Sequence, residues 1–424
     1  MIKIYEYGQI SNDELFERGL AASSVEDVVS EIIKNVRERG DEALREYSLK
    51  FDKVELSSLE VSSEEIEEAM ALVDPDMIRI LEQAAANIRH FHEKQLRNSF
   101  IINDEEGIVM GQKVIPIENV GLYVPGGTAA YPSTVLMDSI PAKIAGCSQL
   151  VMVTPPGKNG KVNPVILAAA KVAGVDRIFK VGGAQAVAAL AYSTESIPKV
   201  DKIVGPGNAF VAEAKKQVFG LVSIDMIAGP SEVLVVSDAN SDPRSVAADM
   251  LAQAEHDRMA TAVLVTDSMD FAKKVASQIE LQLAGLERQE IARTSIDNNG
   301  KIIVAGDLKK AIDIANEIAP EHLELAVDDP FDYLDSIKHA GSIFLGRNTP
   351  EALGDYMAGP NHTLPTLGTA RFSSPLSVDD FVKKTQYTYF TRDALSRYYK
   401  DVAKFARQEG LTAHARSAEI RFED

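Results

Sequence analysis

The chain has 424 residues, of which 45% are hydrophobic and 25% are charged, a composition typical of a globular protein with two or three domains. Its formal net charge of −19 argues against a nucleic-acid-binding surface, because phosphate recognition needs a basic patch. The first residues lack a signal-peptide pattern, and no apolar run is long enough for a membrane helix. We therefore expect a cytoplasmic protein that binds neither nucleic acid nor membrane.

Residues 1–20 are polar and predict an N-terminal arm, and helical periodicity follows in the residues before 100. Short apolar runs then end in glycine or proline, at 121–124, 150–153, 178–181 and 202–204. A second series of runs occupies 232–236, 262–265, 301–304 and 342–345, with helical stretches between them. This alternation predicts an α/β fold with two Rossmann-like domains, each built on an incomplete and mostly parallel sheet.

We predict four segments. Residues 1–20 form the arm, and residues 21–120 with 232–376 form one α/β domain. Residues 121–231 form a second α/β domain inserted into the first. Residues 377–424 form a helical tail without strands, which is too short for a large core of its own and should pack on another surface.

Gln253 and His256 are three residues apart near the end of a predicted helix, so both side chains share one face. This pair is either half of a metal site or an exposed amide beside a helix-end histidine. Asp355 and His362 lie in one loop rich in glycine and proline. Asp355 either completes the metal site or caps a turn.

Glu321 and His322 follow Ala319-Pro320 and form the best candidate for a catalytic pair, because both groups can accept protons near neutral pH. In a strand they would point in opposite directions, so we expect a loop here. The alternative is a solvated glutamate beside a structural histidine.

The glycine turns at strand ends suggest a nucleotide site. Gly205-Pro206-Gly207 begins like the dinucleotide fingerprint, but Phe210 stands where the third glycine belongs. The turn alone leaves NAD, another phosphate and no cofactor open. Gln185 and Asn208 follow glycine turns and either contact a cofactor or cap helices. Cys147 could serve a thiol mechanism, but its apolar surroundings favour a small buried side chain.

Together these motifs resemble histidinol dehydrogenase over nearly the whole chain. The matching segments, in order, are Gly121–Gly127, Gly182–Ala186, Val204–Asn208, Ala228–Glu232, Gln253–His256, Ala319–Glu324 and Gly359–Thr366. The resemblance implies an NAD-dependent, zinc-requiring, four-electron oxidation of L-histidinol to L-histidine through histidinaldehyde, in histidine biosynthesis.

The resemblance also implies the roles of particular residues. Zinc would be held by Gln253, His256, Asp355 and His414, which lie in the sheet domain of residues 232–376 and in the tail. These four would also contact the substrate, together with Ser231, His322, His362 and Glu409. NAD would contact Tyr123, Gln185 and Asn208 of the inserted domain, and Glu321 and His322 would be the catalytic bases.

In the family that this chain resembles, the protein is a homodimer whose tail crosses to the other subunit, so that active sites are shared. Two other hypotheses remain open from the residues: a zinc hydrolase in which Glu321 activates water, and a two-domain protein that binds a small metabolite.

Overall fold

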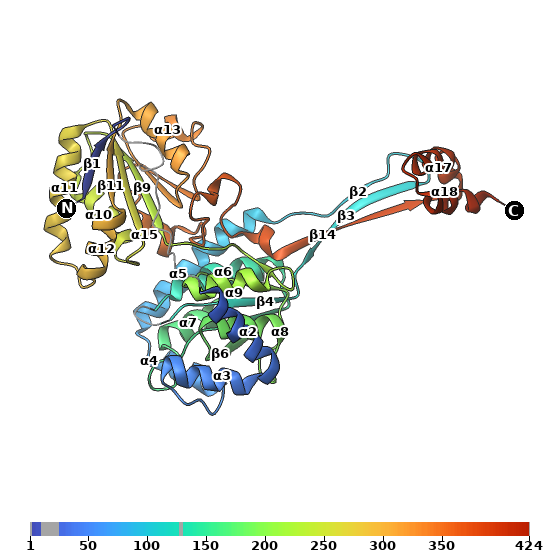
Figure 1. The fold of residues 1–424 in the computed structure, drawn as a ribbon, viewed down its shortest axis with the longest axis horizontal. Helices are drawn as coiled ribbons and strands as arrows, with labels where there is room; N and C mark the ends of the chain where they lie inside the picture. Colours follow the sequence, from blue (N-terminus) through green and yellow to red (C-terminus); the bar gives the residue numbers. More distant parts are fainter. Residues whose placement is uncertain (1, 10–24, 127–129, 424) are drawn as a thin grey trace. The chain divides into compact units, whose positions relative to one another are not determined.

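The computed structural model describes residues 2–9, 25–126 and 130–423. They divide into two compact units, Met1–Gln95 with Ile117–Phe381 and Leu96–Pro116 with Val382–Asp424, which we call the main unit and the small unit (Figure 1). Residues 10–20 of the predicted arm and Gly127 of the first glycine turn lie outside the described residues. Within the described ranges, no helix is long and apolar enough to span a membrane.

The described residues of the main unit contain a six-stranded sheet in the order β1-β11-β10-β9-β12-β13, with every neighbouring pair parallel. Its strands are β1 (Lys3–Glu6), β9 (Glu232–Ser237), β10 (Thr261–Thr266), β11 (Lys301–Val304), β12 (His322–Ala326) and β13 (Ser342–Leu345). The four apolar runs predicted as strands are confirmed. The arm prediction was wrong for β1, because this short strand adds to the sheet edge beside β11.

Helices cover both faces of the six-stranded sheet (Figure 1). One face packs against α10 (Pro243–Ala254), α11 (Met269–Leu283) and α12 (Gln289–Asn299), and the other against α13 (Leu308–Ile318). Val233 and Val235 of β9 belong to the first core, and Leu234 and Val236 to the second. A strand that is apolar on both sides is typical of a parallel sheet covered by helices. The predicted α/β class is confirmed.

The second sheet of the main unit, as described, has five parallel strands in the order β6-β5-β4-β7-β8. They are β4 (Asn119–Tyr123), β5 (Gln149–Val153), β6 (Arg177–Phe179), β7 (Lys202–Val204) and β8 (Ser223–Ile224). The connecting helices are α6 (Pro132–Ala145), α7 (Pro164–Ala173), α8 (Gly183–Tyr192) and α9 (Ala209–Val218). The sheet order reverses between β4 and β7, and a reversal of this kind is where open α/β sheets bind ligands.

The amino-terminal helices pack on the five-stranded sheet, which corrects the predicted domain assignment. Helices α2 (Glu26–Arg39) and α3 (Asp41–Tyr47) share a core with α8 and α9, while α4 (Ser63–Leu72) and α5 (Pro75–His92) share the opposite core with α6 and α7. The sequence had predicted that residues 21–120 belong to the domain of the six-stranded sheet. The physical reason for the difference is that the early helices find their apolar partners on the helices that cover the two faces of the five-stranded sheet, and they enlarge both of its cores.

The small unit combines an antiparallel sheet with short helices. Its strands are β2 (Phe100–Ile102), β3 (Ile108–Pro116) and β14 (Val382–Phe390), and its helices are α16 (Arg392–Ser396), α17 (Tyr399–Gln408) and α18 (Thr412–Glu419). The helical character of the tail is confirmed, but the absence of strands was wrong, because β14 is rich in β-branched and aromatic residues and pairs along all of β3. The hydrophobic cluster of this unit consists of Ala403, Ala406 and Ala415.

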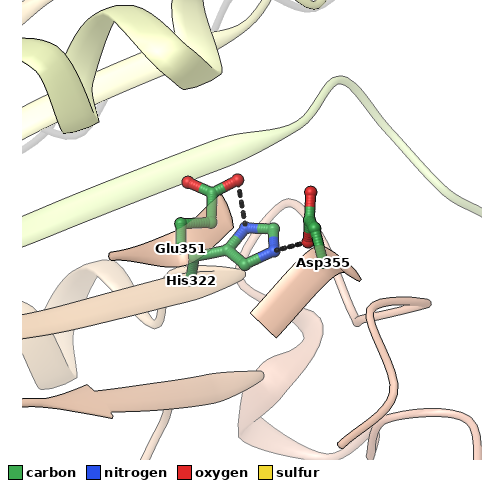
Figure 2. Close-up of side chains that lie close together, drawn as sticks. All are labelled: His322, Glu351 and Asp355. Carbon is green, nitrogen blue, oxygen red and sulfur yellow. Dashed lines mark ion pairs between the residues drawn. The ribbon is translucent and has the colours of Figure 1, made fainter. Parts of the chain in front are cut away.

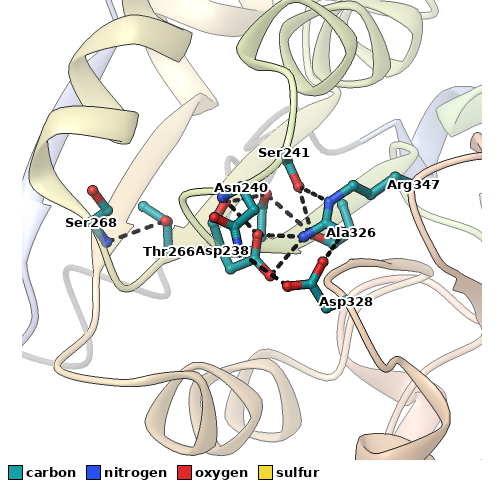
Figure 3. Close-up of polar contacts among 9 residues, drawn as sticks. Asp238, Asn240, Ser241, Thr266, Ser268, Ala326, Asp328 and Arg347 are labelled. Carbon is teal, nitrogen blue, oxygen red and sulfur yellow. Dashed lines mark hydrogen bonds and ion pairs between the residues drawn. The ribbon is translucent and has the colours of Figure 1, made fainter.

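A polar network around Arg347 joins the carboxyl ends of β9 and β12 (Figure 3). The guanidinium lies 2.6 Å from Asp238 and 2.5 Å from Asp328. Its Nε donates to Ser241 Oγ at 2.9 Å, and this hydroxyl donates to the carbonyl of Ala326 at 2.7 Å. The usual ligand edge of the six-stranded sheet is therefore tied together by ion pairs, and the candidate site lies at the opposite, amino ends of the same strands.

Candidate active site

The predicted catalytic pair lies where β12 begins. His322 is the first residue of this strand and pairs in register with Val233 of β9. Glu321 lies in the bend before the strand, so the expected loop is confirmed for Glu321 and wrong for His322. The side chains converge, with Glu321 Oε2 at 3.7 Å from His322 Nδ1. They converge because both side chains reach the backbone of Glu232: its N–H donates to Glu321 Oε2 at 2.8 Å, and its carbonyl lies 3.0 Å from His322 Nδ1.

The imidazole of His322 is buried and held in one tautomer. A backbone carbonyl can only accept, so the contact with Glu232 places the proton on Nδ1. The amide nitrogen of Gln253, 3.2 Å from Nδ1, is then a packing contact rather than a donor. Nε2 keeps its lone pair and has no hydrogen-bond partner among the described residues. Burial lowers the pKa of His322 to about 4, so the ring is neutral at neutral pH and can accept a proton.

Two carboxyl groups flank the ring of His322 on opposite sides (Figure 2). Glu351 Oε1 lies 3.8 Å from Nδ1, and Asp355 Oδ1 lies 3.9 Å from Nε2. In the described part of the chain these three side chains form a group whose potential metal-binding atoms lie within 4.8 Å of one another. The imidazole stands between the carboxyl groups, which suits an exchange of protons better than coordination of one ion by all three.

A second layer of acids lies behind Glu351. Glu324 Oε1 accepts the N–H of Glu351 at 2.7 Å, and the Glu324 side chain shares a hydrogen bond with Asp249. Burial raises the pKa of Glu324 to about 8 and that of Asp249 to about 6, and it raises the pKa of Glu351 well above its ordinary value. Sequence reasoning missed these residues. The available signal was a glutamate inside the otherwise apolar strand segment after His322.

A pocket of about 130 Å³ opens beside His322, lined by β12, β13 and the loop that follows Asp355. His362, another lining residue, has its Nδ1 3.9 Å from Asp355 Oδ1. Burial lowers the pKa of His362, so both imidazoles in the pocket favour the neutral form. A carboxylate between two neutral imidazoles suits a small molecule that carries basic nitrogen atoms.

Gln253 and His256 lie at and just after the end of α10. Gln253 is buried, so its alternative role as an exposed amide is wrong, and its Oε1 has no hydrogen-bond partner among the described residues. His256 is half-buried and close enough to His322 and His362 to contribute to their lowered pKa values. Imidazole and carboxylate are groups that zinc binds, and the unpartnered oxygen of Gln253 is a further donor near His322.

The remaining predicted substrate residues fall in two places. Ser231 is half-buried directly before β9, where its carbonyl accepts the N–H of Thr261 at 3.0 Å. Glu409 and His414 belong to the small unit, at the end of α17 and in α18, and both are exposed there. Their contribution to a site stays a prediction.

The predicted NAD residues occupy the carboxyl ends of strands in the five-stranded sheet. Tyr123 ends β4, Gln185 lies in the first turn of α8, and Asn208 precedes α9. The Tyr123 hydroxyl accepts the N–H of Gly183 at 3.0 Å, and burial raises the pKa of this phenol to about 12. Asn208 caps α9 by accepting two backbone N–H groups, which confirms the alternative role predicted for it and leaves its amide nitrogen exposed for a ligand.

The turn at Gly205 requires a glycine, because the backbone passes close to Tyr123. Gly205 has a φ of 117°, and a Cβ there would lie 2.1 Å from the carbonyl oxygen of Tyr123. Asp225 Oδ2 accepts the N–H of Gly205 at 2.8 Å, and Lys215 Nζ donates to its carbonyl at 2.9 Å. The N–H and the carbonyl of Gly205 are both bound by side chains of the protein, so a cofactor phosphate would need other donors.

Cys147 is a small buried side chain, as predicted. Its Sγ lies 3.8 Å from the carbonyl oxygen of Phe381, and burial raises the pKa of the thiol to about 11. A thiol with such a pKa is a poor nucleophile at neutral pH.

Comparison with known proteins places this geometry in a family. The family model for histidinol dehydrogenase matches residues 17–422. The chain is 55% identical to a histidinol dehydrogenase from Clostridium acetobutylicum, over 100% of this chain and 99% of that protein. It is 57% identical to one from Syntrophotalea carbinolica, over 94% and 93% of the two chains.

Comparison with solved structures gives the same family. A crystal structure of histidinol dehydrogenase from Elizabethkingia anophelis matches with a TM-score of 0.94 and 40% identity, covering 99% of this chain and 98% of that chain. An acetylating aldehyde dehydrogenase from Geobacillus thermoglucosidasius, at 14% identity and a TM-score of 0.50, shares the fold alone. The resemblance stated from the sequence motifs is confirmed: the chain belongs to the histidinol dehydrogenase family and is a dehydrogenase.

Proposed function

We propose that the chain catalyses the NAD-dependent oxidation of L-histidinol to L-histidine through histidinaldehyde, with zinc bound at the active site, as a step of histidine biosynthesis. The observation that carries this proposal is the neutral, buried His322, whose uncommitted Nε2 faces a small pocket with Asp355 and His362. Family membership indicates the class of reaction. The geometry adds a base, His322, beside a pocket that suits basic nitrogen atoms.

Gln253, His256 and Asp355 of one chain, together with the partner's His414, would hold the zinc ion. When bound, zinc would act as a Lewis acid toward the basic nitrogen atoms of the substrate, and NAD would supply the hydride acceptor. Tyr123, Gln185 and Asn208 would contact NAD.

His322 would accept the proton of the substrate alcohol at Nε2. Asp355, 3.9 Å from this atom, stabilises the charged ring that results. The pKa of about 4 means that His322 gives the proton up again readily, which two successive oxidations require. A well-placed general base of this kind contributes about 10²–10⁴ to a rate.

Glu321 would accept a proton from the water that hydrates the aldehyde before the second oxidation. Burial raises the pKa of Glu321 well above its ordinary value, which favours the protonated carboxyl in the ligand-free chain. Its Oε2 also receives the N–H of Glu232 at 2.8 Å, a bond that favours the ionised form. Added positive charge in the pocket would shift Glu321 toward the carboxylate that a base needs.

We also propose a homodimer in which the small unit completes the partner's site. The small unit has a hydrophobic cluster of only three described alanines, and it exposes large apolar side chains, among them Ile101 and Phe405. A small unit with little core and exposed apolar side chains is typical of a subunit interface. Glu409 and His414 are exposed on the same unit and are free to serve a neighbouring site.

The test is a turnover assay with purified chain, L-histidinol and NAD, followed by the absorbance of NADH. We expect two NADH for each histidinol, because a four-electron oxidation requires two hydride transfers. A zinc hydrolase would need no NAD, and a metabolite-binding protein would bind histidinol without turnover. Absence of NADH with zinc-loaded protein would reject the proposal.

A further inference from the structure

Helix α6 (Pro132–Ala145) carries a proline in its interior, at position 141. Proline has no N–H, so Pro141 cannot donate to the carbonyl of Met137 four residues earlier. The side-chain Nδ2 of Asn361 donates to this carbonyl instead, at 2.7 Å and away from solvent. A buried carbonyl needs a partner. Pro141 thus creates an acceptor on α6, and the loop that carries His362 supplies the donor.

The residue on the other side of His362 is anchored to the same helix. The N–H of Thr363 donates to Asn361 Oδ1 at 2.8 Å, and Thr363 Oγ1 donates to Asp138 Oδ1 at 3.0 Å. Asn361 and Thr363 therefore hold consecutive residues of α6, Met137 and Asp138. All of these side chains are buried, so water does not compete for the bonds.

The ring of His362 reaches α6 as well. Its Nε2 lies 3.4 Å from Oγ1 of Thr134, one helical turn before Met137, and it hydrogen-bonds the backbone of Asp355 on its other side. Residues 361–366 have no regular secondary structure, so no ladder of backbone bonds fixes this loop. The side-chain anchors at positions 361 and 363, with the Leu376 N–H that the Thr363 carbonyl accepts at 2.9 Å, hold the backbone on both sides of the imidazole.

We propose that Asn361 is a positioning residue: by binding the Met137 carbonyl that Pro141 leaves without a helical donor, it sets the imidazole of His362 in the pocket. The helix that receives Asn361 belongs to the five-stranded sheet, whereas His322 begins a strand of the six-stranded sheet. The anchor therefore ties the position of His362 to α6, a helix of the domain predicted to bind NAD. The part of this inference that concerns histidinol rests on the proposed function.

The test compares Asn361→Asp with Asn316→Asp. The first substitution keeps the size and the acceptor of Asn361 but replaces the donor to Met137 with a carboxylate oxygen in the lining of the pocket. Thr363→Val, which adds no charge, therefore serves as the second test. Asn316 is a matched control, because its Nδ2 donates to a backbone carbonyl, that of Ser336, at 2.9 Å, and its Oδ1 accepts a backbone N–H, that of Lys338, at 2.7 Å. It lies on α13, outside the residues that line the pocket.

Two readouts separate positioning from stability. In ligand-free protein labelled at its 7 histidines, Asn361→Asp should move or broaden the His362 ring resonance, and Asn316→Asp should leave it in place. In turnover, Asn361→Asp should raise the KM for histidinol about tenfold, as expected for one lost hydrogen bond, with the KM for NAD within about twofold of wild type. Thr363→Val, which removes only the hydroxyl that binds Asp138, should act in the same direction.

A lower melting temperature of Asn361→Asp with an unchanged His362 resonance and an unchanged KM for histidinol would overturn the inference. If Asn361→Asp does not fold, an unchanged His362 resonance and an unchanged KM for histidinol in Thr363→Val would overturn the inference. If the wild-type chain does not oxidise histidinol, the proposed function fails, and the ligand-free His362 resonance still decides the role of Asn361.

Discussion

The backbone of one residue sets the chemistry of the catalytic pair. Glu232 receives the Glu321 carboxyl on its N–H and the His322 ring on its carbonyl. The same contacts orient Nε2 of His322 toward the pocket and keep the Glu321 carboxyl on the Nδ1 side of the ring. Local sequence could nominate Glu321 and His322 as proton-transfer groups, but it could not show this arrangement, because Glu232 lies 89 and 90 residues away along the chain.

Glu321→Gln should separate the two oxidations. The amide oxygen can still accept the N–H of Glu232, so folding should be unaffected, but the amide cannot take a proton from water. We expect the first oxidation to persist and the second to slow by about 10²-fold or more. Rapid mixing should show a burst of one NADH per site followed by slow turnover. An equal fall in the rates of the two oxidations, measured with histidinol and with histidinaldehyde as substrates, would instead show that Glu321 acts through His322.

Cys147→Ser should leave turnover within about twofold of wild type, because no step of the proposed reaction uses this buried thiol. The serine hydroxyl can donate to the carbonyl of Phe381 that the thiol now contacts. The free energy of unfolding should fall by less than about 1.5 kcal/mol. Loss of turnover in folded protein would restore a thiol mechanism to consideration.

At the scale of the element, β12 is the strand on which the site depends, and it was not predicted. Its sequence, His-Leu-Glu-Leu-Ala, places a histidine and a glutamate in a strand whose described residues are all buried. A loop was expected at Glu321 and His322 because neighbouring side chains point to opposite faces in a strand. The glutamate is tolerated because Asp249 and the backbone of Glu351 satisfy it. β9 and β11 each carry their one charged residue at the first position, and the uninterrupted apolar run that follows it predicted these strands.

Glu324→Gln on β12 should alter the pH dependence of stability. Burial raises the pKa of Glu324 to about 8 from an ordinary 4.5, so between these values the native chain keeps a proton that the unfolded chain has lost. Stability from this group is therefore present below pH 4.5 and falls as the pH rises toward 8, by up to about 1.4 kcal/mol for each pH unit. Glutamine cannot ionise, and it can still accept from Glu351 and donate to Asp249.

The measurement is urea unfolding of wild type and Glu324→Gln at pH 5, 6.5 and 8. The advantage of the variant should grow with pH across this series. A constant difference between the two proteins would show that Glu324 does not hold its proton in the native chain.

At the scale of the whole molecule, sequence periodicity revealed two parallel sheets but not which sheet each early helix covers. The apolar faces of α2 to α5 would suit either sheet, and only the packed cores show that they complete the five-stranded one. The six-stranded sheet instead recruits the first residues of the chain as β1. Such choices depend on contacts between segments far apart in sequence, which a local pattern does not encode. The same limit applies to the tail, because the role proposed for it depends on a second chain.

The crossing tail predicts opposite results for two hybrid dimers that carry the same two lesions. In a co-purified hybrid of His414→Ala and Gln253→Ala chains, one site would combine an intact Gln253 with the partner's intact His414, so about half of wild-type activity should return. In a hybrid of wild type with the doubly substituted chain, each site would carry one lesion, and activity should be lost. If the tail served its own chain, the first hybrid would be inactive and the second half-active, which would exclude shared sites.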